Sequence, residues 1–563
     1  MVVMIKSMSQ QDPQPTPGIA VPAAGRTISP LRVPLLNGRL IAAVEEAAAR
    51  LVRTAFSTII RDANDYVCLL LRENGDSIAE NATAIPAFNG CLPRTARALL
   101  ASRNGRFEEG DVFVTNDPWL GTGHLYDMCV LTPLFTGGHV IGFCGSVAHV
   151  ADVGGSLWGV DTRSVYEEGL RVPLTRLRQG RQLNEELLNL IRANVRVPDE
   201  VIGDILSLLH ANDIMAGRVL KILGEEGYDD LRDIGEAICA AAETAMRARL
   251  RAIPDGEYVS VTELDGYGSE LRISCKISIR GDAISVDYSG SSPQQEVAIN
   301  VPINNTFALT AYVLKCIVDP VSPRNEGTYR PIHVTAPAGS ILNAAHPAPV
   351  NARHLTFLHL ASALMQALAP VLPERIIAES GSPFVQVVFS GINARGRLFV
   401  HPSFDAPGMG ARHDKDGLAA TPFPNNTGGA PIETVELNTS LRYLQKALVP
   451  DSGGPGRFRG GLGTEIAVTW DGEGTVELSI LGDRIRHPAR GVLGGGAGMP
   501  ALIELNGTPL PAKGRARLAR GDVLRIRNAG GGGYGPPGLR DARLVEEDIR
   551  RGFISQEGAR AYD

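Results

Sequence analysis

The sequence predicts a multidomain α+β protein with mixed sheets, and three observations support this fold class. The chain has 563 residues, which is too long for one compact hydrophobic core. Apolar residues recur at a spacing near 3.6 between residues 193 and 253, which indicates helices, whereas they alternate between 257 and 290, which indicates a half-buried sheet. Residues 453–535 are rich in glycine and contain short alternating runs, which predicts a β-rich module.

The first 192 residues predict a tail, one helix and a group of strands. Residues 1–30 are rich in Pro, Gln and Ser and are expected to be mobile. Apolar residues at steps of three and four predict a helix over 40–62. Strands are predicted at 66–71, 111–115, 128–134 and 140–148. Because residues 135–138 form a short linker containing two glycines, the last two strands are expected to form a hairpin.

The rest of the chain contains both helical and extended segments. Helices are predicted at 201–210, 214–225, 231–253, 300–318, 355–369 and 539–551. Strands are expected within 257–290 and at 464–469, 475–481 and 523–527. We therefore expect a mobile tail (1–30), a metal-site α/β domain (31–192), a helical segment (193–253), a mixed α/β domain (254–445) and a β-rich C-terminal module with a final helix (446–563).

The composition excludes several classes of function. Hydrophobic residues make up 44% and charged residues 21%, which rules out disorder for most of the chain. The net charge is −6 and aromatic residues make up 5%, so no nucleic-acid partner is expected. The seven cysteines include no C-x-x-C pair, which favours free thiols in a reducing compartment. No apolar run approaches ~18 residues, and the N-terminus lacks a secretory pattern. These features predict a cytoplasmic protein without a membrane partner.

The densest cluster of polar residues lies between positions 116 and 161. His124 and Asp127 are three residues apart, and His149 follows the second strand of the predicted hairpin. Because the open ends of a hairpin are adjacent, His149 is expected to return close to Asp127 and His124. Two imidazoles and one carboxylate suit a divalent ion with an open position for water. The alternative is that each histidine only hydrogen-bonds a neighbouring backbone group.

Other candidate residues carry a weaker signal. Asp65 precedes the first predicted strand, and it is either a fourth ligand or an ordinary turn carboxylate. No serine lies in a G-x-S-x-G setting, so a serine hydrolase is not supported. Six further histidines share no spacing, and most are expected to lie on the surface or to be satisfied in the core: His346, His354, His359, His401, His413 and His487.

Several motifs resemble those of the hydantoinase B/oxoprolinase family over about residues 35–562. The most specific are Asn116-Asp117-Pro118-Trp119 through His124-Leu125-x-Asp127, followed by Ala148-His149-x-x-Asp152-x-Gly154-Gly155. Further matches are Asp65-Tyr66-x-Cys68, Tyr166-Glu167-Glu168-Gly169-Leu170, Pro323-Arg324-Asn325-Glu326-Gly327 and Pro450-Asp451-Ser452-Gly453-Gly454. One departure is that the usual I-P-x-H-x-G appears as Ile85-Pro86-Ala87-Phe88-Asn89-Gly90, so the substrate preference of hydantoinases cannot be copied to this chain.

The resemblance implies a function and a site. It implies the B-type subunit of an ATP-dependent amidohydrolase that opens cyclic amides such as hydantoins, oxoproline or lactams. ATP and Mg are expected on an A-type partner subunit, which phosphorylates the substrate. One divalent ion (Zn, Mn or Fe) is expected on His124, Asp127 and His149, with Asp65 as a further ligand, and a metal-bound hydroxide is expected to attack the activated substrate.

Two carboxylates and two rival functions are left open by the sequence. Asp152 and Glu168 are candidate catalytic residues, as anchors of the site or as proton carriers, and the alternative for each is a hydrogen-bonded structural carboxylate. The resemblance to acetone carboxylase subunits implies a rival function, an ATP-dependent ketone carboxylase. A third hypothesis is a non-catalytic scaffold that stabilises the partner subunit.

Overall fold

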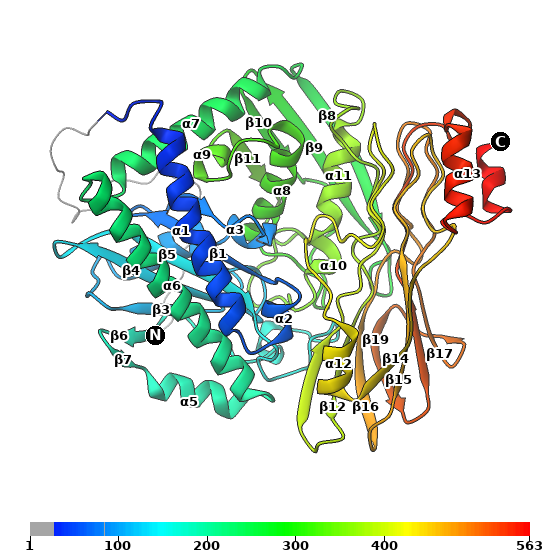
Figure 1. Ribbon diagram of the computed structural model, residues 1–563, viewed down its shortest axis with the longest axis horizontal. Coiled ribbons are helices and arrows are strands. Elements are labelled where there is room, and N and C mark those ends of the chain that lie inside the picture. The colour runs from blue at the N-terminus through cyan, green and yellow to red at the C-terminus, as the bar shows by residue number, and fades with distance from the viewer. Residues whose placement is uncertain (1–26, 84) are drawn as a thin grey trace.

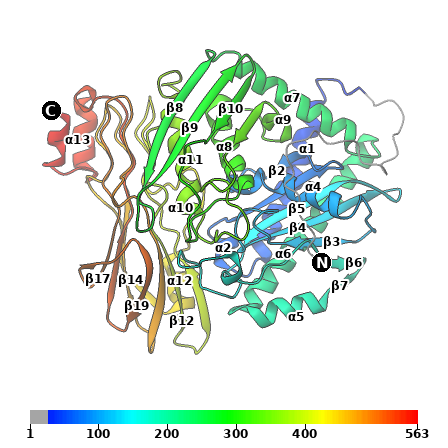
Figure 2. The same ribbon diagram turned by 180° about the vertical axis from the view of Figure 1, so that it is seen from behind.

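A computed structural model describes residues 27–83 and 85–563 of the chain (Figures 1 and 2). In these residues the strands form four separate sheets with helices packed around them, which confirms the predicted α+β class with mixed sheets. Of the mobile tail predicted for residues 1–30, residues 1–26 lie outside the described residues.

The largest sheet contains the predicted hairpin. Each of its seven strands is antiparallel to its neighbours. In spatial order they are β2 (Ser77–Glu80), β1 (Tyr66–Arg72), β5 (His139–His149), β4 (Asp127–Thr136), β3 (Val112–Thr115), β6 (Thr175–Gln179) and β7 (Gln182–Leu183). β4 and β5 pair as predicted, and Asp127 lies directly opposite His149 at the open end of the hairpin.

Helices cover both faces of this sheet. α1 (Val33–Thr54) and α6 (Pro198–Glu226) run side by side over one face (Figure 1), and α4 (Leu92–Ser102) lies on the other (Figure 2). The buried side chains of α1 include Leu40, Val44, Ala47 and Leu51, which recur at the expected steps of three and four. Their burial joins the sheet to its helical layer in one hydrophobic core.

Several helix limits differ from the prediction for local reasons. The helices expected at 201–210 and 214–225 form one helix, α6, because Asn212 between them is buried and its Nδ2 donates to the Val130 carbonyl 3.1 Å away. The helix expected at 40–62 begins at Val33 and ends at Thr54, because the backbone N–H groups of Phe56 and Ser57 donate to Asp204 instead. α2 (Thr58–Arg61) follows this break, and α5 (Glu185–Asn194) was not predicted.

The second sheet lies in the middle of the chain. Its strands are β11 (Ile332–Thr335), β10 (Ala283–Asp287), β9 (Leu271–Arg280) and β8 (Gly256–Leu264), and β10 and β11 are parallel. The helices nearest to it are α7 (Arg232–Leu250), α8 (Ile303–Val318) and α11 (His359–Leu368). Three short helices lie in the connections: α3 (Pro86–Asn89), α9 (Glu326–Tyr329) and α10 (His354–Phe357).

Two further sheets enclose a second hydrophobic core. One contains β13 (Leu398–Pro402), β12 (Gln386–Ile392), β16 (Thr475–Leu481) and β19 (Lys513–Ala519). The other contains β14 (Leu441–Leu448), β15 (Thr464–Trp470), β20 (Val523–Arg527), β17 (Leu502–Leu505) and β18 (Thr508–Pro509). β12 precedes residue 446 in the sequence and β16 follows it, so this pairing joins segments on both sides of the position where the C-terminal module was predicted to begin. α12 (Ile432–Thr439) packs beside these sheets, and α13 (Ala542–Arg550) lies at the far end of the molecule (Figure 1).

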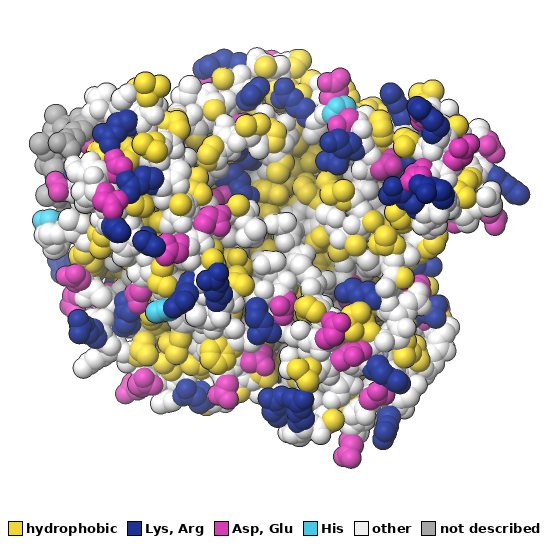
Figure 3. All heavy atoms as spheres, viewed as in Figure 1, with side chains coloured by type: hydrophobic (Ala, Val, Ile, Leu, Met, Phe, Trp, Pro, Cys, Tyr) yellow, Lys and Arg dark blue, Asp and Glu magenta, His cyan; other side chains and the backbone are white. Residues whose placement is uncertain are grey.

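Two surface properties follow from the composition. Within the described part of the chain, the helices are all too short or too polar to cross a bilayer. On the face seen in Figure 3, basic and acidic side chains are interspersed, as the small net charge of −6 leads one to expect.

Candidate metal centre

Three predicted ligands meet at the open end of the β4–β5 hairpin. His124 precedes β4, Asp127 begins β4, and His149 ends β5. One ligand atom from each lies within 4.8 Å of the other two, and this is the one such group of three or more His, Cys, Asp or Glu among the described residues. Oδ1 of Asp127 lies 2.8 Å from Nε2 of His124 and 3.2 Å from Nδ1 of His149. All three residues are buried.

The hydrogen bond of His124 assigns its tautomer. Nδ1 of His124 lies 3.2 Å from the carbonyl oxygen of Asn351, and a carbonyl can only accept, so Nδ1 carries the proton. Burial lowers the pKa of His124 to about 4, and the ring is therefore neutral near pH 7. Its Nε2 then presents a lone pair to the carboxylate of Asp127 and has no hydrogen-bond partner within residues 27–83 and 85–563. Two facing lone pairs in a buried site fit a cation between them.

Asp127 is held in place through its second oxygen. Oδ2 accepts hydrogen bonds from Thr122 Oγ1 and from the Arg353 guanidinium, the latter at 2.8 Å. Burial alone would raise the pKa of Asp127, but His124 and the Arg353 guanidinium hold it well below its ordinary value. Gly123 makes this contact possible, because its φ is +94° and a Cβ there would lie 2.8 Å from Cδ of Arg353. Asp127 is therefore ionised, with Oδ1 directed at the two imidazoles.

Aromatic rings fix the planes of the two imidazoles. The Tyr126 ring stacks on His149 with a centroid distance of 5.1 Å, and the Trp158 ring lies 4.5 Å from the same imidazole. Trp158 Nε1 donates to the Asn351 carbonyl at 2.8 Å, the same oxygen that His124 contacts. The rings therefore exclude water from the back of the site and leave few rotamers open to either histidine.

Asp65 lines the same cavity but is not part of the group of three. Its backbone carbonyl accepts the N–H of His149 at 3.1 Å, which ties the start of β1 to the end of β5. Burial raises the pKa of its carboxyl to about 6. The structure thus brings Asp65 near the site, and its role as a further ligand stays a prediction.

Neither candidate catalytic carboxylate lines the cavity. Asp152 accepts hydrogen bonds from the backbone and guanidinium of Arg196. Oε1 of Glu168 accepts from the backbone N–H groups of Val350 and Asn351, at 2.6 and 2.9 Å. Both residues hold nearby backbone by hydrogen bonds, which fits an anchor of the site and a structural carboxylate equally. Their proposed roles in the reaction stay predictions.

The cavity contains polar residues that the sequence did not single out. The space between its walls measures about 410 Å³, its opening to solvent included. Most of the six further histidines were expected to lie on the surface or to be satisfied, and His354 is an exception, because it is buried and both its ring nitrogens lack hydrogen-bond partners in the part of the chain that the structure describes. Burial lowers the pKa of His354 well below its ordinary value. Nε2 of Gln386 is buried and, in the same part of the chain, also lacks a partner.

Aromatic side chains make up much of the remaining wall of the cavity: Phe88, Trp158, Phe357, Phe384 and Phe404. The polar run Asn351-Ala352-Arg353-His354 in front of an apolar helix is the one sequence signal that could have pointed to this part of the site. Gln386 and Phe384 carry no such signal, because they reach the cavity only through the fold.

Comparison with known proteins gives consistent matches over most of the chain. A model of the family described as hydantoinase B/oxoprolinase matches residues 29–537. A protein of Pseudomonas sp. (strain NS671), provisionally named as the B-type subunit of a D-/L-hydantoinase, is 31% identical over 95% of this chain and 94% of that one. The crystal structure of ATP-dependent caprolactamase from Pseudomonas jessenii matches with a TM-score of 0.89 and 28% identity, over 95% of this chain and 96% of that one. A nucleotide-free structure of acetone carboxylase matches with a TM-score of 0.84 and 20% identity, over 94% and 79% of the two chains, and shows a shared fold.

Proposed function

The chain belongs to the hydantoinase B/oxoprolinase family, and we propose that it is the B-type subunit of an ATP-dependent amidohydrolase acting on cyclic amides. Similar proteins are named as the B-type component of a hydantoinase and as an ATP-dependent caprolactamase, and both substrate types are cyclic amides. The sequence contains no G-x-x-x-x-G-K-S/T phosphate loop. This agrees with the expectation that an A-type partner subunit binds ATP and Mg.

The observation that carries the proposal is the buried approach of His124 Nε2 to Asp127 Oδ1 at 2.8 Å, with no proton between them. His124, Asp127 and His149 would hold one divalent ion, for which zinc, manganese or iron is suited by this set of ligands. When bound, such an ion supplies Lewis acidity toward a substrate oxygen or a water molecule.

The other residues of the site would serve to orient and shield it. Arg353 and Thr122 hold the second oxygen of Asp127, so the first stays directed at the imidazoles. The Asn351 carbonyl keeps the proton of His124 on Nδ1, and Trp158 covers the rings from the side. Such fixed ligands lose little entropy when the site is filled.

The first test measures metal content. We expect one divalent ion per purified chain by elemental analysis, and loss of that ion in His124→Ala and His149→Ala. His346→Ala is the control, because His346 is exposed and lies outside the cavity. Variants of His124 and His149 that retain the ion and full activity would support the scaffold hypothesis instead.

The second test measures the reaction. Purified with its A-type partner, the chain should release phosphate and ring-opened product in equal amounts from a hydantoin or a lactam. Use of ATP without ring opening would refute the proposal. Bicarbonate-dependent ATP use with a ketone, and none with a cyclic amide, would assign the ketone carboxylase instead; the likeness to acetone carboxylase supports only the fold.

A further inference from the structure

The cavity at the candidate metal centre contains two buried side chains with unsatisfied polar atoms. His354 lies at the start of α10 and is 8% exposed, and Gln386 lies at the start of β12 and is 1% exposed. Both ring nitrogens of His354 and Nε2 of Gln386 lack hydrogen-bond partners among the described residues. Buried polar atoms without partners are rare in folded proteins, because each has lost its hydrogen bonds to water.

The cavity that these two side chains line contains other polar residues, among them Asp65, Arg353 and Asn425, and none of the described residues is hydrogen-bonded to the ring nitrogens of His354 or to Nε2 of Gln386. Much of the cavity wall is aromatic, with Phe88, Phe357 and Phe384 among its side chains. Trp158, which packs against His354 with a centroid distance of 5.3 Å, donates its only N–H to the Asn351 carbonyl. The polar atoms of His354 and Gln386 are therefore available to a molecule in the cavity.

We infer that His354 and Gln386 bind the two polar atoms of the substrate's amide group before the substrate is activated, an inference that rests on the proposed function. A neutral imidazole accepts a hydrogen bond at one nitrogen, and the Gln386 amide donates from Nε2. A small ring holds its amide in the cis form, so its N–H and C=O lie on the same edge. His354 accepts from the amide N–H, and Gln386 donates to the amide carbonyl.

This arrangement selects a secondary cyclic amide. An acyclic trans amide presents its N–H and C=O on opposite edges and satisfies only one of the two side chains. The aromatic wall receives the ring carbons. His354 and Gln386 are thus residues that determine specificity, and they are separate from the three candidate metal ligands.

The test compares the binding of 2-piperidone and cyclohexanone, which differ in that the ring N–H of the first is CH₂ in the second. Calorimetry on the full, metal-loaded chain without ATP or partner measures binding without turnover. We expect the wild-type chain to prefer 2-piperidone by about tenfold, as one hydrogen bond to a buried acceptor provides. His354→Phe should abolish this preference, whereas Gln386→Leu should weaken both ligands equally.

The control is His401→Phe, because His401 is also a buried histidine but lines a different cavity. It should keep the wild-type preference. Metal content should be unchanged in all three variants, and thermal melts identify any variant that fails to fold. If His354→Phe fails to fold, His354→Leu replaces it. Gln386→Leu tests the inference independently of either His354 variant.

Three outcomes would overturn the inference. A preference that survives in His354→Phe means that His354 does not bind the amide. Loss of the metal in His354→Phe or Gln386→Leu assigns these residues to the metal centre instead. A wild-type chain that holds its metal but binds no lactam overturns the inference alone, because ring opening with the A-type partner tests the substrate class separately. Retained preference in His354→Phe likewise leaves the proposed function intact.

Discussion

At the scale of single residues, Glu168 acts on the candidate metal centre without touching the cavity. Its Oε1 accepts the backbone N–H groups of Val350 and Asn351, which fixes the direction of the Asn351 carbonyl. That carbonyl accepts from His124 Nδ1 and from Trp158 Nε1. A carboxylate more than forty residues from His124 in sequence thereby sets the orientation of its ring.

Loss of Glu168 should weaken metal binding. Glu168→Ala frees the Asn351 carbonyl, and we expect about a 10- to 100-fold increase in the Kd for the divalent ion, the usual cost of losing a group that orients a ligand. Glu168→Gln keeps an acceptor oxygen and should stay near the wild-type value. Competition with a chromophoric chelator measures the affinity. Glu167→Ala is the control, because Glu167 is exposed, and wild-type affinity in Glu168→Ala would contradict the positioning role.

The residues of the site differ in how far sequence could predict them. His124, Asp127 and His149 could be predicted because a spacing of three residues and one short hairpin bring them together, and both are local properties of the sequence. Arg353 and His354 lie more than two hundred residues from His124, and Gln386 lies on another sheet. The polar residues at 351–354 are a local signal, but a local pattern does not report which distant residues they contact. His354 therefore looked like any other isolated histidine, and only its unpartnered nitrogens among the described residues distinguish it.

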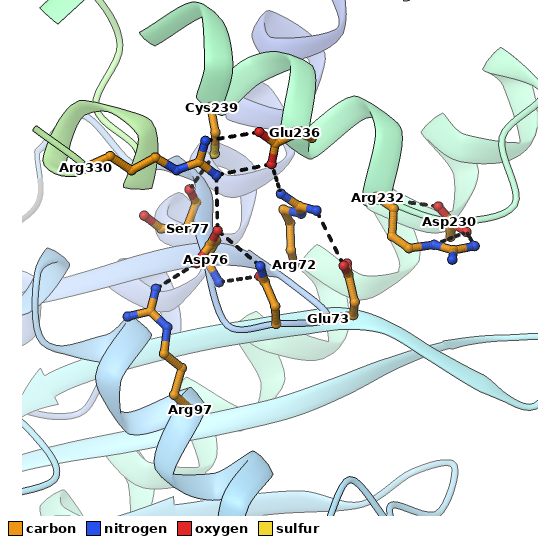
Figure 4. Close-up of polar contacts among 11 residues, drawn as sticks. Arg72, Glu73, Asp76, Ser77, Arg97, Asp230, Arg232, Glu236, Cys239 and Arg330 are labelled. Atoms are coloured by element: carbon orange, nitrogen blue, oxygen red, sulfur yellow. Dashed lines mark hydrogen bonds and ion pairs between the residues drawn. The ribbon is translucent and has the colours of Figure 1, made fainter. Parts of the chain in front are cut away.

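At the scale of elements, a network of charges joins the β1–β2 turn to three helices (Figure 4). Asp76 in that turn contacts Arg97 of α4 at 2.7 Å and Arg330, at the end of α9, at 3.5 Å. Arg330 also contacts Glu236 of α7 at 3.0 Å, and Glu236 contacts Arg72 at the end of β1. These pairs are partly buried, so water screens them less than it screens isolated surface pairs.

Removing the charge of Asp76 should destabilise the chain. Asp76→Asn leaves Arg97 and Arg330 without their shared carboxylate, and we expect the free energy of unfolding to fall by about 1–3 kcal/mol, as for charged hydrogen bonds in partly buried settings. Urea unfolding followed by circular dichroism measures the change. Glu547→Gln serves as the control, since its ion pairs with Arg550 and Arg551 are exposed on α13, and it should move the midpoint little. Equal shifts in the two variants would contradict the network.

At the scale of the whole molecule, the cavity combines parts of the chain that belong to different sheets. Its metal-ligand side comes from the seven-stranded sheet, whereas Gln386 comes from the sheet of β12 and β16. The fold class and about half of the described strands followed from local periodicity. The pairing of β12 with β16 did not, because the partners are separated by more than eighty residues and strand order is fixed by packing. The site therefore exists only in the complete fold.

The stability of the whole chain should fall as the pH rises from 7.2 to 8.0. Burial raises the pKa of Glu168 to about 8 and that of Glu200 to about 7, against about 4.3 in an unfolded chain. The folded state therefore binds more protons than the unfolded state in this window, and stability decreases with pH. Burial lowers the pKa of five histidines, namely His124, His346, His354, His359 and His401. Their protonation in the unfolded chain, where the pKa is about 6.5, opposes the decrease near pH 6.5 and becomes small above pH 7.2.

The measurement that checks this is the urea midpoint at pH 7.2, 7.6 and 8.0, with a chelator present because metal binding also varies with pH. The wild-type midpoint should decrease across the series, and the double variant Glu168→Gln/Glu200→Gln should reduce the decrease, because an amide has no proton to lose. The thiols add to the decrease toward pH 8, since burial raises their pKa in the fold and they titrate with a pKa of about 8.5 in the unfolded chain, so the difference between the wild type and the double variant measures the share of the two carboxyls. A wild-type midpoint that rises over this window, or a double variant that falls as steeply, would assign the pH dependence to other groups.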